Sequence, residues 1–116
     1  MSREEDLEAI DISIDEAKAK IQRKEALERL QQNPDFKTII DDGFLNSHAI
    51  RQVMLKAHPQ MQEEKAQNML NRQITAIGEL KQFFIAIYSE GMNAANAISQ
   101  DEATREELLQ EDLIDG

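Results

Sequence analysis

Cysteine and tryptophan are absent from this 116-residue sequence, and aromatic residues make up only 4% of it. Without cysteine the chain has no disulfide framework, no thiolate nucleophile and no thiolate metal ligand. No apolar run approaches the roughly 18 residues of a membrane-spanning helix, so we expect no membrane partner. The first ten residues, MSREEDLEAI, lack the basic and apolar regions of a secretory signal. We therefore expect a cytoplasmic protein of one domain, with or without tails.

Residue patterns that carry catalysis are also missing. His48 and His58 stand ten positions apart, with no metal-ligating residues at suitable spacing around them. The DDG at 41–43 has too few oxygen ligands nearby to bind calcium. We therefore expect no enzymatic activity, no cofactor and no metal. With a net charge of −10 and five aromatic residues, direct nucleic-acid binding is not expected either.

The acidic residues concentrate at the two ends of the chain. Residues 1–16 and residues 101–116 each carry seven acids and one base, a net charge of −6 for each end. Two interpretations remain open: solvated ends that keep the protein in solution, or an end that docks on a basic partner surface. We predict an acidic N-terminal arm at 1–12, a helical domain at 13–100 and an acidic C-terminal tail at 101–116.

Helix start and stop signals occupy the first half of the chain. Ser13 and Glu16 form a capping box, which predicts a helix over about 14–32. Two short helices are expected next. Asn33 caps the first, over about 34–41, which ends at a left-handed Gly43. Ser47 caps the second, over about 48–57, which ends before proline. The residues expected to be buried in the short helices are Phe36, Ile39, Ile40, Ile50, Val53, Met54 and Ala57.

From Gln60 onward the helical signal is long and follows a heptad seam with a second apolar seam beside it. An unbroken helix of roughly 38 residues would be about 57 Å long, more than a compact domain of this size covers. Gly91 either ends this helix or lets another backbone come close. We predict an all-α fold, a helical bundle with two short helices, one long C-terminal helix and flexible acidic ends. The same stripe predicts a homo-oligomer, with an interface formed by Leu70, Ile74, Ile77, Leu80, Phe84, Ile87, Tyr88 and Ile98.

The stretch AIDISIDEAK alternates in the manner of a strand, although the chain offers no second strand. In one interpretation Leu7, Ile10 and Ile14 form an i, i+3, i+7 set and the helix starts earlier. In another, residues 7–13 form an extended arm whose Ile10 and Ile12 contact a neighbouring subunit or partner. In a third interpretation this stretch is disordered. The capping box at Ser13 favours a boundary there, because a cap inside a helix has no free N–H groups to satisfy.

Two segments carry a resemblance to a known group of proteins. They are ISIDEAKAKIQRKEALERLQQNPDFKTIIDDGFL and AIGELKQFFIAIYSEG, which together with the chain between and after them cover roughly residues 12–98. They resemble small, uncharacterised, acidic α-helical proteins of tailed bacteriophages. The resemblance implies a phage context, and carries over no site residue.

From these features we expect a non-enzymatic phage structural or assembly protein, such as a scaffold, chaperone or minor virion component. Its partners would be itself and other phage or host proteins, in the host cytoplasm or in the virion. The alternative is a small acidic regulator or inhibitor that binds a basic host protein surface.

Overall fold

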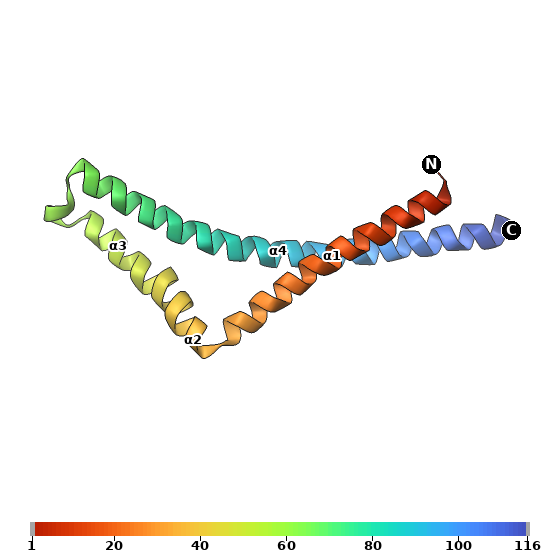
Figure 1. Ribbon diagram of the computed structural model, residues 1–116, viewed down its shortest axis with the longest axis horizontal. Helices are drawn as coiled ribbons and strands as arrows, with labels where there is room; N and C mark the ends of the chain where they lie inside the picture. The colour runs from red at the N-terminus through yellow and green to blue at the C-terminus, as the bar shows by residue number, and fades with distance from the viewer. Residues whose placement is uncertain (1, 116) are drawn as a thin grey trace. The chain divides into compact units, whose positions relative to one another are not determined.

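The computed structural model describes residues 2–115 and is almost entirely helical (Figure 1). Helix covers 95% of the described residues, and no strand occurs among them, so the all-α prediction is confirmed. The elements are α1 (Arg3–Gln32), α2 (Pro34–Phe36), the π-helix η1 (Lys37–Ser47), α3 (His48–Lys56), the 3-10 turn η2 (Pro59–Met61) and α4 (Glu64–Asp115).

The chain divides into two compact units. The terminal unit consists of Met1–Ala26 and Ile87–Gly116, and the central unit of Leu27–Ala86. The terminal unit carries sixteen acids and six bases, whereas the central unit carries seven of each. The whole net charge of −10 therefore belongs to the terminal unit, and the central unit is neutral.

In the terminal unit α1 and α4 lie side by side in opposite directions (Figure 1). Ile14, Ala17 and Ala94 are buried between them. Ile10 is half-buried on the same side, whereas Ile12 is 57% exposed. The interpretation of Leu7, Ile10 and Ile14 as a helical set is therefore confirmed. The extended arm and the disordered stretch are wrong for residues 3–12, because these residues belong to α1.

Helix α1 begins at a capping box that lies eleven residues before the one predicted. The Glu5 N–H donates to Ser2 Oγ at 3.1 Å, and the Ser2 N–H donates to Glu5 Oε2 at 3.4 Å. This is the reciprocal pattern of S-x-x-E. The predicted cap at Ser13 is wrong: the residue lies inside α1, and its hydroxyl donates to Asp101 Oδ2 at 2.7 Å. Helix thus continues through both predicted domain boundaries, and the three-part division stays a prediction.

Gly91 lies inside α4 and is buried against α1. A Cβ at this position would lie less than 3.0 Å from three side-chain carbons of Lys24. Of the two roles considered for Gly91, close approach of a neighbouring helix is therefore correct. Gly78 differs, because a Cβ there would meet nothing within 4 Å.

In the central unit, Asn33 caps the next helical segment as predicted. Its Oδ1 accepts from the backbone N–H groups of Asp35 and Phe36, at 2.9 and 3.2 Å. The predicted break at Gly43 is wrong, since no described glycine has positive φ and the chain continues as η1 into α3. Ser47 is not a cap either, because its hydroxyl donates to the Asp42 carbonyl at 2.8 Å. A π-helix of eleven residues is unusually long, and helical start and stop signals do not encode it.

Leu27, Leu70 and Ile77 form the buried apolar core of the central unit. The rings of Phe36 and Phe84, in the same unit, pack against each other with centroids 6.0 Å apart. A hydrogen-bonded turn joins α3 to α4. The predicted end of α3 before proline is confirmed, since His58 has an extended backbone and its Nδ1 accepts from the Gln60 N–H at 3.1 Å.

Candidate interaction surface

Helix α3 turns its apolar side away from the core. The sequence predicts burial of Ile50, Val53 and Met54, but these side chains are 54%, 55% and 69% exposed. Ala57 is exposed as well. The predicted burial of this face is therefore wrong within the chain. Helical periodicity correctly identifies a coherent apolar face, but it does not determine whether the covering partner belongs to the same chain.

The opposite side of α3 places a polar side chain in the interior. Gln52 is only 6% exposed, and its Oε1 accepts no hydrogen bond from the described residues. A buried, unpaired amide oxygen costs about 1–3 kcal/mol. The helix thus buries a glutamine and exposes three large apolar side chains. We define the outer face as Ile39, Ile50, Val53 and Met54, where Ile39, predicted to be buried, is 65% exposed.

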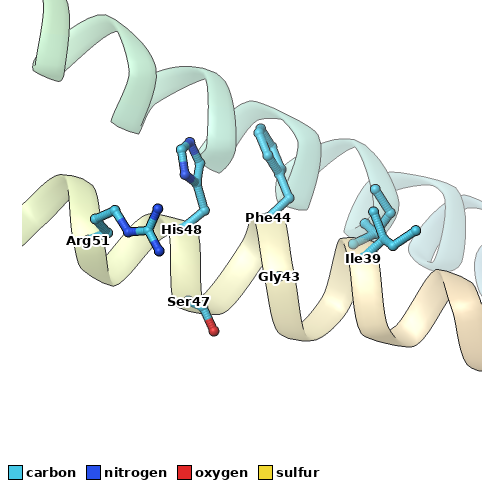
Figure 2. Close-up of a pocket in the computed structure, with 7 residues that line it drawn as sticks. Ile39, Gly43, Phe44, Ser47, His48 and Arg51 are labelled. Atoms are coloured by element: carbon cyan, nitrogen blue, oxygen red, sulfur yellow. The ribbon is translucent and has the colours of Figure 1, made fainter.

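A hollow of about 410 Å³ lies along η1 and the start of α3 (Figure 2). Its walls are mainly apolar, and the rings of Phe44 and His48 stack there with centroids 5.5 Å apart and planes at 21°. Arg51 adds a cationic group at one end. Figure 2 shows the side chains of Phe44, His48 and Arg51 on one side of the helix, with the Ser47 hydroxyl directed elsewhere. The residues lining the hollow are Ile39, Ile40, Gly43, Phe44, Ser47, His48 and Arg51.

Sequence reasoning missed this hollow because it placed a helix end at Gly43 and a new start at Ser47. A continuous helical path brings residues on both sides of that supposed break onto one surface. The available signal was the recurrence of Ile39, Gly43 and Ser47 at intervals of four, which continues to Arg51. The other predicted members of the short helices, Phe36 and Ile40, are half-buried.

The predicted interface along α4 is largely covered by the chain's own helices. Leu70 and Ile77 are buried in the central unit at 1% and 5% exposure. Tyr88, in the terminal unit, is 46% exposed, and Lys24 Nζ lies 4.9 Å from its ring centroid. A self-association role for this set stays a prediction. The half-buried members are Ile74, Leu80 and Phe84 in the central unit and Ile87 and Ile98 in the terminal unit.

Polar contacts link α1 to α4 within the terminal unit. Arg3 pairs with Glu111 at 3.5 Å and with Asp112, and Arg105 pairs with Asp11 at 3.6 Å. Arg3 and Arg105 are the two bases of the acidic end segments, and both bridge to the other helix. The side chains are 35–59% exposed, so each pair contributes little to stability.

Neither a metal centre nor a membrane span is found in the described part of the chain. Residues 2–115 contain no group of three or more His, Cys, Asp or Glu placed to hold a metal ion. No helix among them combines the length and apolar character needed to cross a bilayer.

Comparison with protein families finds no matching family, and comparisons with curated proteins and with solved structures find no similar protein. The assignment of the outer face and the hollow as a candidate interaction surface therefore rests on the geometry of this chain alone.

Proposed function

We propose that this protein is a non-enzymatic structural or assembly component of a tailed bacteriophage, acting through protein–protein contacts. A scaffold, a chaperone and a minor virion component are the members of this class that fit. The phage context comes from the sequence resemblance. The mode of action is supported by one structural observation, the exposed apolar outer face on α3 and η1.

The exposure of the outer face supports a contact function because large apolar side chains are costly to leave in water. Burying one such side chain contributes roughly 1.5–3 kcal/mol. Only six hydrophobic side chains are buried among the described residues, whereas Ile39, Ile50, Val53 and Met54 are more than half exposed. A surface of this kind on a monomer marks an interaction site.

The bundle architecture belongs to this proposal. Each unit offers few helices to cover its apolar residues, and a partner helix on the outer face would complete a bundle around the central unit. In this view the homo-oligomer, rather than the single chain, is the complete fold. Its expected location is the host cytoplasm or the virion.

The charge distribution favours a second candidate, an acidic regulator that binds a basic host protein. The terminal unit carries the entire net charge of −10, and α1 and α4 bring both acidic ends together there. Such a surface accelerates encounter with a basic protein.

A protein inventory of purified particles separates the two candidates. Particles and their precursors from a phage that encodes the chain would be purified and analysed by mass spectrometry. An assembly protein is expected in one or both preparations. Absence from both, together with recovery of one basic host protein on the tagged chain, would replace the first proposal by the second.

A further inference from the structure

We infer that the outer face, with the hollow beside it, is the site where a second copy of this chain docks in an antiparallel arrangement. The inference rests on the proposed function only in taking the chain to work by protein contact. It specifies what the proposed function leaves open: the surface, the partner and the direction of pairing.

The charge of each unit points to a second copy as the occupant of the outer face. The central unit has seven acids and seven bases, so two copies meet there without net repulsion. The terminal unit, at −10, would repel another copy and attract a basic protein instead. The neutral apolar outer face therefore fits a neutral apolar partner, and the same face on another chain has that character.

The order of charges along η1 and α3 sets the direction of pairing. In chain order the exposed charged residues of this segment are Lys37, Asp42 and Arg51, so the exposed acid stands nearer its N-terminal end than Arg51 does. Two copies in the same direction would align acid with acid and base with base. An antiparallel pair instead places Arg51 of each copy toward Asp42 of the other, as a two-fold axis requires.

The shape of the surface is self-complementary. The hollow between Ile39 and Arg51 has mainly apolar walls, and Met54, the most exposed apolar side chain of α3 at 69%, follows Arg51 by three residues. In an antiparallel pair Met54 of each copy reaches the hollow of the other. A flexible thioether is well suited to fill an irregular apolar hollow lined by an aromatic ring. Such an anchor in a pocket is the usual centre of an interface.

The mass of the full-length chain in solution tests this inference. Wild type should show a dimer mass by light scattering, whereas Met54→Asp should dissociate at least about a hundredfold more readily, because dimerisation would bury two carboxylates. Leu113→Asp is the matched control. It makes the same charge change at a leucine that is 83% exposed in the terminal unit, and it should keep the dimer mass. Circular dichroism should show unchanged helicity in both variants.

A single-cysteine experiment gives a second measurement that does not depend on weakening the dimer. The sequence has no cysteine, so Ile50→Cys introduces one thiol on the exposed outer face, close to the expected two-fold axis. Mild oxidation should convert this variant to a covalent dimer, while Leu113→Cys should remain largely monomeric on a denaturing gel. The inference is overturned by a monomeric wild type, by a Met54→Asp dimer as stable as wild type, or by equal cross-linking of the two cysteine variants.

These outcomes are distinct from those of the particle inventory. A monomeric wild-type chain that is present in particles would overturn the antiparallel dimer and leave the proposed function standing. A dimeric chain that is absent from particles and their precursors would overturn the proposed function and leave the antiparallel dimer standing.

Discussion

Individual residues decide how closely the helices of each unit approach one another. Gly91 is the clearest case, since α1 lies against α4 at a point where any side chain would overlap Lys24. Gly78 lies in the same helix but faces open space. The two glycines thus offer the same substitution in opposite surroundings.

Gly91→Ala should lower the free energy of unfolding by about 1–3 kcal/mol, because the Lys24 Cβ is fixed to the α1 backbone and the helices must separate. Gly78→Ala should raise it by about 0.5–1 kcal/mol through helix propensity alone. Urea unfolding followed by circular dichroism measures both changes. Equal stabilisation by the two alanines would show that α1 and α4 are not in close contact at Gly91.

Gln52 is buried although its amide oxygen, Oε1, accepts no hydrogen bond from the described residues. Gln52→Leu replaces a buried amide whose Oε1 accepts no hydrogen bond by an apolar group of similar size, so we expect stabilisation by about 1–2 kcal/mol. Gln73→Leu is the control, because Gln73 is exposed on α4 in the same unit. It should change stability by no more than about 0.5 kcal/mol. A destabilised Gln52→Leu would mean that the amide has a partner in the folded protein.

At the scale of elements, the chemistry of single residues predicts where a helix begins or ends better than it predicts which way the helix turns its apolar face. The end of α1 near Gln32, the Asn33 cap and the stop at His58 follow from single residues whose backbone preferences are strong. The start of α1 was misplaced because Ser2 and Glu5 form an equally good capping box outside the region with a clear periodic signal. The sequence alone does not show which of two equally good capping boxes begins the helix.

The direction in which α3 presents its apolar face could not be predicted, because it depends on packing partners far away in the sequence. The same reason applies to the hollow, which needs η1 and α3 to be continuous through Gly43 and Ser47. The candidate site was therefore predictable as a set of apolar residues. It was not predictable as an exposed surface.

The pairing of α1 with α4 in the terminal unit should respond to salt. Acids outnumber bases there by sixteen to six, and the bridges made by Arg3 and Arg105 are largely exposed. Repulsion should therefore exceed attraction, and raising sodium chloride from about 10 mM to 1 M, which shortens the Debye length from about 30 to 3 Å, should raise the thermal midpoint by a few degrees.

Circular dichroism melts at several salt concentrations measure this effect. A double variant, Glu106→Gln with Glu107→Gln, removes two charges from the exposed side of α4 and should show a smaller salt dependence. A midpoint that falls as salt rises would show that the bridges outweigh the repulsion.

At the scale of the whole molecule, the neutral and acidic parts of the chain have separate roles in what is proposed. The central unit supplies the apolar outer face for a second copy, and the terminal unit keeps the assembly charged. The predicted three-part division of the sequence does not follow this separation. It was drawn along the chain, whereas the charge imbalance becomes a property of one unit only when the two ends come together.

The contacts within the terminal unit also fix an order of events during synthesis. Ser13 meets a residue 88 positions further along, and Arg3 meets one 109 positions further along. The central unit is complete once residue 86 has left the ribosome, whereas the first 26 residues also need residues 87–112 before their contacts can form. Domains that are finished early fold early. The N-terminal segment therefore stays without its partner helix until residues 87–112 have been synthesised, and its seven acids among the first sixteen residues help to keep it in solution.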